Sequence, residues 1–403
     1  MTVPASLDAE PQQPPPAATA GLLSRWRALR DRLLASPEFR RRALAFAPTR
    51  WIARRRAAAL FDLVAGFVYS QVLHACVRLR VFEMLAVAPL SAQEIARRTD
   101  LPLAPALRLL DAAVALKLLE HRGAVHYGLG SLGAAMVGNP AVAAMVEHHA
   151  TLYADLRDPI ALLRGQAGDL ARFWPYALDA APSALAGPQV ADYSALMAAS
   201  QPLVADQILD AYPLHRHRCL LDVGGGEGGF LATAAHRHPA LRLMLFDLPA
   251  VAQRAARRLE SLGLAAQSAT HGGDFLQDAL PRGADVISLV RVVHDHDDAT
   301  CLRLLRAVRR ALPDGGTVLV AEPLAQTKGA ERMGDAYFGF YLFAMGRGRP
   351  RTFAELRALL EAAGFDRVRR IATRVPLQTG LLVARAGSSC SARGTDSIDK
   401  CKL

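Results

Sequence analysis

The sequence predicts an α/β fold, in which a mainly helical part precedes a doubly wound sheet. From Cys219 onward, apolar strand segments alternate with helical segments, as in a parallel sheet covered by helices on both faces. The first of these strands runs directly into a row of glycines, which is typical of a nucleotide-binding sheet. The chain has 403 residues, more than one hydrophobic core usually serves, so we expect two domains and an extension.

The composition is that of a folded chain with a large positive charge. Hydrophobic residues make up 52% of it and charged residues 21%, which excludes a chain that is disordered throughout. The formal net charge of +11 suits an anionic partner, either nucleic acid or a lipid surface, and much of the excess lies between Arg25 and Arg56. Five scattered cysteines indicate reduced thiols in the cytoplasm, and we expect no secretory signal.

Residues 1–56 are expected to form an extension. Its first 20 residues, rich in proline and alanine, are expected to be disordered. The arginine-rich segment 22–51 places apolar residues at helical spacing, which leaves two interpretations open. It is either a basic amphipathic helix on an anionic membrane surface or a helix packed on its own domain. The apolar stretch 57–77 is expected to be a poor membrane span because polar residues interrupt it, namely Asp62, Ser70, Gln71 and His74.

Residues 57–140 predict a winged helix-turn-helix. Ser91 begins a helix, with Glu94 completing a capping box, and a second helix over 104–116 precedes a strand–turn–strand wing. A helix that reads DNA needs basic and polar side chains on its exposed face, and this second helix offers mainly Arg108. We therefore expect a dimerisation scaffold and no nucleic acid partner. A ligand-sensing DNA-binding regulator is the alternative from another class, which a gel shift at physiological salt would distinguish.

Residues 141–212 are expected to form a helical connector whose larger side chains line a substrate pocket or only pack together. These side chains are His148, His149, Tyr153, Phe173, Trp174, Tyr176, Tyr193 and Met197. Residues 213–386 are expected to form the catalytic domain, with five parallel strands followed by an antiparallel hairpin. The predicted strands are 220–223, 241–246, 267–270, 286–290, 317–321, 368–373 and 380–384. The polar tail, 387–403, is expected to be disordered.

The glycine-rich loop after the first strand carries the strongest motif. Gly224, Gly225 and Gly226 let the backbone approach a ligand closely, just before a helix N-terminus. Together with Asp222, their spacing fits both a dinucleotide motif and a tighter one, so a nicotinamide cofactor and S-adenosylmethionine both remain open at this point. Asp247 ends the next strand, where an acidic residue accepts hydrogen bonds from ribose hydroxyls.

Further polar residues follow the remaining parallel strands, at the sheet edge where ligands bind. Asp274 and Phe275 follow the third strand, and His294 follows the fourth. Histidine is the side chain best suited to proton transfer near neutral pH, so His294 is a candidate general base. Glu322, at the end of the fifth strand, would orient the imidazole and stabilise its protonated form.

The acidic and histidine-rich turn around His294 raises the question of a metal site. Adjacent residues on a turn seldom converge on one ion, and no distal ligands are evident, so we expect no metal. The residues that follow are expected to cap the next helix, namely His296, Asp297 and Asp298.

These motifs together resemble the plant caffeate-type O-methyltransferase family, over residues 68–385. The matching segments are Asp222-Val-Gly-Gly-Gly, Phe246-Asp-Leu-Pro, Gly272-Gly-Asp-Phe, Val293-His-Asp, Ala311-Leu-Pro-Asp-Gly-Gly and Ala321-Glu-Pro. The resemblance implies a homodimer with a Rossmann-like catalytic domain that binds S-adenosylmethionine. It implies cofactor contacts from Asp222, Gly224, Gly225, Gly226, Asp247, Leu248, Asp274, Phe275 and Arg291. It also implies that His294 is the base, with Glu322 or Asp295 as its partner, because Pro350 stands where the plant enzymes have a second glutamate.

Within the family, the stretch 334–352 and the basic extension resemble the branch that acts on hydroxylated acyclic carotenoids. The implied acceptor is the tertiary hydroxyl of 1-hydroxyneurosporene or demethylspheroidene, and the alternative is a bacteriochlorophyll precursor or a phenol. The apolar stretch 333–345 suits a long polyene or a buried helix at a dimer interface. The expected substrate contacts are Met197, Phe338, Tyr341 and Met345. A lipophilic substrate would give the extension a reason to lie on a membrane.

Overall fold

The computed structural model describes residues 22–174, 187–376 and 379–387. The leader (1–20), Tyr176 and the tail beyond Gly387 lie outside the described residues, so the expectations for them stay predictions. The chain divides into two compact units, residues 1–72 and 73–403.

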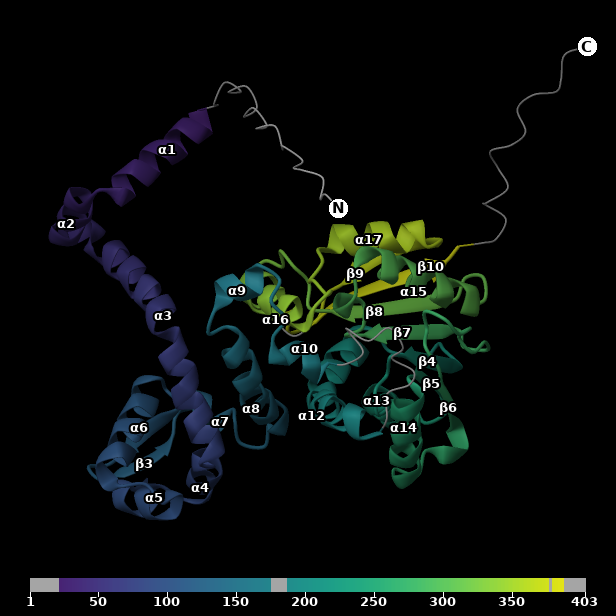
Figure 1. Cartoon of the computed structure of the whole chain (residues 1–403), viewed down its shortest axis with the longest axis horizontal. Coiled ribbons are helices and arrows are strands. Elements are labelled where there is room, and N and C mark those ends of the chain that lie inside the picture. The colour runs from purple at the N-terminus through teal and green to yellow at the C-terminus, as the bar shows by residue number, and fades with distance from the viewer. Residues whose placement is uncertain (1–21, 175–186, 377–378, 388–403) are drawn as a thin grey trace, which may run out of the picture. The chain divides into compact units, whose positions relative to one another are not determined.

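The described part of the first unit is helical. Helix α1 covers Leu22–Ala35, α2 covers Pro37–Ala45, and α3 begins at Ala47 and ends at Arg78, beyond this unit (Figure 1). The Ser36 hydroxyl accepts a hydrogen bond from the Phe39 N–H at 3.3 Å, and Pro37 occupies the first helical position. The expected helical segment is therefore broken at Ser36. Steric clash with Pro37 disfavours helical backbone angles for the residue before it.

Helix α3 runs without a break through residues 56 and 57, where a domain boundary was expected. The helix is long enough to span a membrane, and its most apolar stretch of 18 residues has a mean hydropathy of 1.5, which is also sufficient. Only 11% of that stretch is buried. The expectation that 57–77 is a poor span is therefore wrong by length and composition, because the four polar residues are too few to offset the apolar ones. Core helices of soluble proteins can meet the same criterion.

The second unit begins with the predicted winged helix. Its elements are α4 (Val81–Val87), β1 (Leu90–Ser91), α5 (Ala92–Thr99), α6 (Leu103–Ala115), β2 (Leu119–Arg122) and β3 (His126–Leu129), with the strands in the antiparallel order β1-β3-β2. The predicted capping box is only half formed. The Ser91 hydroxyl accepts the Glu94 N–H at 3.2 Å, but the Glu94 carboxylate binds Arg97 and Arg98 instead.

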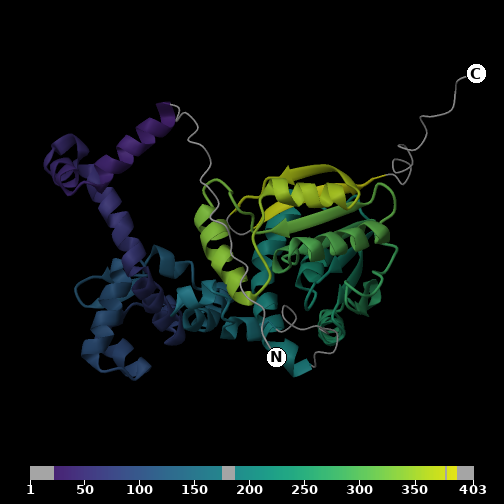
Figure 2. The same ribbon diagram turned by 45° about the horizontal axis from the view of Figure 1, so that its top comes forward.

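A helical connector follows, as predicted. Its helices are α7 (Ser131–Ala134), α8 (Pro140–Asp155), α9 (Pro159–Leu163), α10 (Asp169–Phe173) and α12 (Gly187–Ala211). Helices α8, α10 and α16 (Phe338–Met345) share a core of apolar and aromatic side chains, among them Leu152, Leu170, Trp174 and Leu342. This core places α16 beside the connector, although the two are far apart in sequence (Figure 2).

The catalytic part is a seven-stranded sheet in the order β6-β5-β4-β7-β8-β10-β9. Its strands are β4 (Cys219–Val223), β5 (Arg242–Asp247), β6 (Ser268–Gly272), β7 (Val286–Val290), β8 (Thr317–Glu322), β9 (Phe365–Ile371) and β10 (Gly380–Ala386). The first five are parallel, and β10 lies antiparallel between β8 and β9. The predicted sheet is thus confirmed, with one refinement: β9 runs in the same direction as the five parallel strands.

Alternating residues of the central strands face two separate cores. Leu221 and Ile287 face a core with α15 (Asp298–Ala311) and α17 (Phe353–Ala362). Leu220 and Val286 face the opposite core with α12, α13 (Gly229–Arg237) and α14 (Pro249–Ser261). Because both faces are covered, the carboxyl edge of the sheet is where a ligand can enter.

Candidate active site

A cavity of about 410 Å³ opens at the carboxyl edge of the parallel strands. The loops after β4, β5, β6 and β7 all contribute to its wall, together with helices α12 and α16. The structure places nearly all predicted cofactor residues on that wall: Gly224, Gly225, Gly226, Asp247, Leu248, Asp274, Phe275 and Arg291. Asp222 and Glu322 instead lie behind the wall, almost completely buried.

The loop after β4 requires glycine for two different reasons. Gly224 and Gly226 have φ angles of 68° and 58°, in the left-handed region that favours glycine. A Cβ atom on Gly225 would lie 2.5 Å from the Asp222 carboxylate, and one on Gly224 would lie 2.8 Å from Val292. Side chains are therefore excluded, and the main chain itself faces the cavity. Such a loop, before the helix that starts at Gly229, fits the close approach of an adenosine cofactor.

Two carboxyl groups lie near this loop. The Asp222 carboxylate accepts a hydrogen bond from the Ser288 hydroxyl at 2.6 Å, and burial raises its pKa to about 7. The Asp247 carboxylate is partly open to the cavity and accepts the N–H groups of Gly226 and Leu248 at 2.8 and 2.7 Å. Desolvation raises the pKa of Asp247 to about 6, although these two N–H donors act in the opposite direction. Asp222 therefore lies buried behind the glycine loop, close to Gly225, while Asp247 can accept hydrogen bonds from hydroxyl groups in the cavity.

His294 lies on the same cavity wall, in a short 3₁₀ turn, Val293–Asp295. Its Nδ1 is hydrogen-bonded to Glu322, and its Nε2 lies 3.1 Å from the Asp295 carboxylate. Burial disfavours the charged imidazolium, but the charges of Glu322 and Asp295 outweigh that effect and raise the pKa of His294. Both partners left open by the sequence are thus present, and neither role depends on Pro350.

Glu322 itself is fixed by the backbone of the same turn. Its Oε1 accepts the N–H groups of Val292 and Val293 at 3.0 and 2.7 Å, while Oε2 binds the imidazole. Only 2% of Glu322 is exposed. This arrangement fixes the orientation of the ring and stabilises its positive charge, as expected for a partner of a general base.

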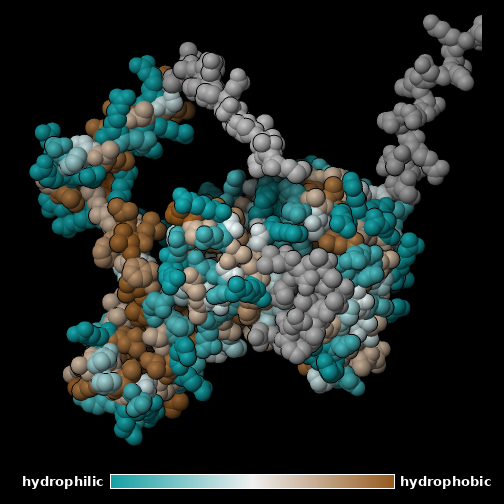
Figure 3. All heavy atoms as spheres, viewed as in Figure 1, coloured by the Kyte–Doolittle hydropathy of each residue, from teal (hydrophilic) through white to brown (hydrophobic). Residues whose placement is uncertain are grey.

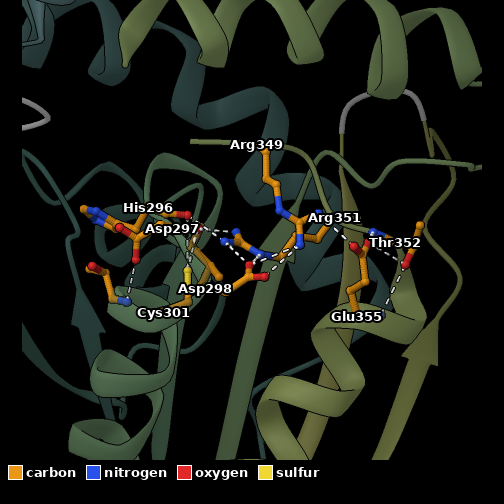
Figure 4. Close-up of polar contacts among 10 residues, drawn as sticks. His296, Asp297, Asp298, Cys301, Arg349, Arg351, Thr352 and Glu355 are labelled. Atoms are coloured by element: carbon orange, nitrogen blue, oxygen red, sulfur yellow. Dashed lines mark hydrogen bonds and ion pairs between the residues drawn. The ribbon is translucent and has the colours of Figure 1, made fainter. Parts of the chain in front are cut away.

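The buried side chain of Arg351 holds the turn that carries His294 (Figure 4). Its guanidinium donates to the carbonyls of Val293 and His296 at 2.9 and 2.6 Å, and to the Asp298 carboxylate at 2.8 Å. These carbonyls flank His294 on both sides. The sequence analysis missed this residue, because nothing in the segment Arg-Pro-Arg-Thr marks the second arginine as buried.

The residues after His294 have different partners, and the expected capping role is correct for one of three. The Asp297 side chain accepts the Thr300 N–H at 2.8 Å and caps α15. Asp298 instead pairs with Arg349 and Arg351, and the His296 ring lies edge-on against Phe275. The prediction for His296 and Asp298 was wrong because it considered only local hydrogen bonds.

The predicted substrate residues also line this cavity, namely Met197, Phe338, Tyr341 and Met345, as do Trp174 and Tyr193 from the connector. The Tyr341 and Tyr337 hydroxyls are hydrogen-bonded to Nε2 of His148 and His149 at 2.8 and 2.7 Å. Burial lowers the pKa of both histidines, so these pairs are neutral at pH 7. Both tyrosine hydroxyls therefore have hydrogen-bond partners, which leaves the cavity wall at α16 mainly apolar.

Arg291 also borders the cavity, but its guanidinium binds helix α12. It donates to the Ser200 hydroxyl at 2.8 Å and to the Gln201 side-chain oxygen at 2.5 Å. Its φ of 57° is uncommon for a non-glycine residue. Among the residues that the structure describes, no group of three or more His, Cys, Asp or Glu side chains could hold a metal ion.

Comparison with known proteins identifies two matching families. The O-methyltransferase dimerisation domain matches residues 61–139, and the O-methyltransferase domain matches residues 153–366. The demethylspheroidene O-methyltransferase of Cereibacter sphaeroides is 47% identical over 322 residues, 79% of this chain and 84% of that protein. The protein of the same name from Rhodobacter capsulatus is 43% identical, over 83% of this chain and 84% of its own length.

Solved structures agree with these matches. Human N-acetylserotonin methyltransferase in complex with S-adenosylmethionine has a TM-score of 0.69 at 25% identity, over 83% of this chain and 98% of that one. The predicted enzyme class and cofactor are thereby confirmed, and the dimerisation match supports a homodimer. The chain belongs to the S-adenosylmethionine-dependent O-methyltransferase family.

Proposed function

We propose that this enzyme methylates the tertiary hydroxyl of an acyclic hydroxycarotenoid, such as 1-hydroxyneurosporene or demethylspheroidene, with His294 as the general base. The observation that carries the proposal is the position of His294, which lies on one cavity wall with the glycine loop and the apolar residues Phe338 and Met345. The names of the relatives from C. sphaeroides and R. capsulatus support the choice of acceptor.

The chain's own residues would position the two ligands against each other. When bound, S-adenosylmethionine supplies a methyl group attached to a positively charged sulfur. The glycine loop would contact its amino acid portion, Asp247 would accept hydrogen bonds from the ribose, and Asp274 and Phe275 would flank the adenine. Methyl transfer is a displacement between two oriented partners, so the protein contributes mainly by placing the acceptor oxygen in line.

The proton of the acceptor hydroxyl would pass to His294. A tertiary alcohol is a weak acid, so its proton leaves as the new carbon–oxygen bond forms and moves to Nε2 of the imidazole. This nitrogen lies 3.1 Å from the Asp295 carboxylate, so the acceptor oxygen must displace or share that contact. A positive charge in the same cavity lowers the pKa of His294, which favours the neutral ring that a base requires.

The size of the cavity sets how a carotenoid would bind. About 410 Å³ has to serve the cofactor as well, so only the hydroxyl-bearing end of a long polyene fits beside it. The apolar wall formed by Met197, Phe338 and Met345 suits such an end, since these side chains provide neither charge nor strong hydrogen-bonding groups for a polar acceptor.

The substrate is tested with methyl-labelled S-adenosylmethionine and detergent-dispersed acceptors. We expect label in the methoxy product of 1-hydroxyneurosporene or demethylspheroidene. A bacteriochlorophyll precursor and a simple phenol serve as competing acceptors in parallel reactions. Label confined to either of them, with the carotenoid unlabelled, would overturn the proposed acceptor while leaving the enzyme class intact.

Asp247→Asn is expected to weaken S-adenosylmethionine binding by about 10- to 100-fold, since hydrogen bonds to a charged group contribute about 1.5–3 kcal/mol. The raised pKa of Asp247, about 6, adds a pH dependence. The carboxylate that accepts the ribose hydroxyls is present above this pKa, so affinity should fall as the pH drops through about 6. Titration calorimetry at several pH values measures both effects, with the exposed Asp366→Asn as control. Affinity independent of both pH and this substitution would contradict the assignment of Asp247.

A further inference from the structure

We propose that residues 22–56, here called the basic platform, dock the enzyme on an anionic lipid bilayer. The platform consists of α1, α2 and the first ten residues of α3, all in the first unit. This inference concerns a surface remote in sequence from the active-site residues and does not rest on the identity of the acceptor.

The platform carries most of the net charge of the protein. It holds eleven arginines against only Asp31 and Glu38, so nine of the eleven net positive charges of the chain lie in these residues. Except for Arg50, which is half-buried, all of these arginines are exposed. Such a cluster attracts the negative headgroups of a bilayer, with each cation near the surface strengthening binding about fivefold.

Apolar side chains are exposed on the same helices (Figure 3). On α1, Leu22, Trp26, Leu29 and Leu33 follow helical spacing, and between 41% and 87% of each is exposed. Buried apolar residues are absent from both α1 and α2. Packing within the first unit therefore does not cover the apolar stripe of these helices. Interfacial helices combine such an exposed apolar stripe with a basic face.

The distribution of tryptophan points to the same partner. Of the three tryptophans of the chain, Trp26 and Trp51 are in the platform and are 61% and 62% exposed, whereas Trp174 is buried in the helical connector. Tryptophan is enriched where a protein meets the headgroup region of a bilayer, because its ring is apolar and its N–H remains in contact with water.

A second copy of the chain fits the platform less well than a bilayer does. In a symmetric dimer the same surface faces itself, which would bring two strongly positive surfaces together. The next part of α3, residues 57–77, contains no arginine or lysine and overlaps the matched dimerisation domain, 61–139. This part of α3 exposes apolar side chains, among them Phe61, Val64 and Phe67. It is therefore a better surface for a protein partner than the platform is.

The experiment is co-sedimentation of the full-length protein with vesicles. We expect strong binding to phosphatidylcholine vesicles that contain about 30% phosphatidylglycerol, and weak binding to phosphatidylcholine alone. Replacing Arg40, Arg41 and Arg42 by glutamine should weaken binding to the anionic vesicles on the order of a hundredfold, from three contributions of about fivefold each. High salt should release the wild-type protein, because it screens the attraction between arginines and headgroups.

A matched control removes the same charge elsewhere. Arg257, Arg306 and Arg310 are exposed residues of the catalytic part, and their replacement by glutamine should leave vesicle binding unchanged. Equal losses in the two triple variants would overturn the proposal, because they would show a response to net charge alone.

Three further outcomes would also overturn it. Binding that resists both high salt and alkaline carbonate would indicate that α3 spans the bilayer. Conversion of the platform variant to a monomer, measured by light scattering, would indicate a dimer interface, and tighter binding to DNA than to vesicles would indicate a nucleic acid partner. Methyl transfer in detergent is expected to be the same in the platform variant, so failure of this proposal is distinguishable from failure of the proposed function.

Discussion

Replacing His294 by alanine is expected to lower kcat for methyl transfer by about 10²- to 10⁴-fold, the usual contribution of a positioned general base. The acceptor proton would then have no recipient on the cavity wall at the place where Nε2 now lies. Binding of S-adenosylmethionine should be nearly unchanged, because the proposed cofactor contacts, the glycine loop and Asp247, come from other segments of the cavity wall. Single-turnover rates and calorimetry together measure the two effects. A variant that retains wild-type kcat would show that His294 only supports the cavity.

The dependence of the rate on pH separates a base from a packing residue. The raised pKa of His294 means that its imidazole is charged at neutral pH in the ligand-free enzyme, so kcat/KM should increase as the pH rises toward that pKa. Asp295→Asn removes one of the charges that raise this pKa, and it should move the ascending limb to lower pH. An unmoved limb would exclude His294 as the group that titrates.

The order and approximate limits of the strands could be predicted because consecutive buried apolar residues mark them. In β4 and β7 all five residues are buried, and the sequence shows each of them as a short, mainly apolar run with one polar residue, Asp222 or Ser288. Strand β9 begins at Phe365, earlier than predicted, because it lies at the sheet edge and its charged exposed residues hide its start. The position of β10 between β8 and β9 depends on contacts between distant segments, which no local pattern reveals.

The site was predictable to the extent that parallel strands bring their carboxyl ends to one edge. That rule alone brings Asp247, Asp274 and His294 to one cavity. It says nothing of side-chain direction, so it does not distinguish Asp247 on the wall from Asp222 behind it, nor does it reveal that Arg291 turns toward α12. Hydrogen bonds between distant segments decide these cases.

Replacing Arg351 by methionine is expected to lower kcat by about 10²-fold, comparable with the cost of a small displacement of catalytic groups. Arg351 does not touch the cavity, and we regard it as a positioning residue. Its guanidinium donates hydrogen bonds to the carbonyls of Val293 and His296. Loss of these hydrogen bonds would free the turn that carries His294. The pH profile should broaden or shift as well, since the distances from His294 to Glu322 and Asp295 set its pKa.

Arg349→Met provides the matched control, because Arg349 also pairs with Asp298 and its replacement removes the same charge. Its side chain is 43% exposed and binds Asp298 and Glu355, whereas its contact with the turn is made by its backbone N–H, which donates to the His294 carbonyl at 2.9 Å. That contact survives the substitution, so kcat should remain near wild type.

Arg351→Lys keeps the charge but not the forked geometry, and it should recover little of the lost rate. A fully active lysine variant, or an equal loss of kcat in both methionine variants, would contradict the positioning role. Either result would show that kcat depends on the positive charge and not on the hydrogen bonds from Arg351 to the turn. Thermal unfolding of all three variants shows whether lost activity reflects lost structure, since a positioning role predicts a fall in kcat in protein that is still folded and binds S-adenosylmethionine.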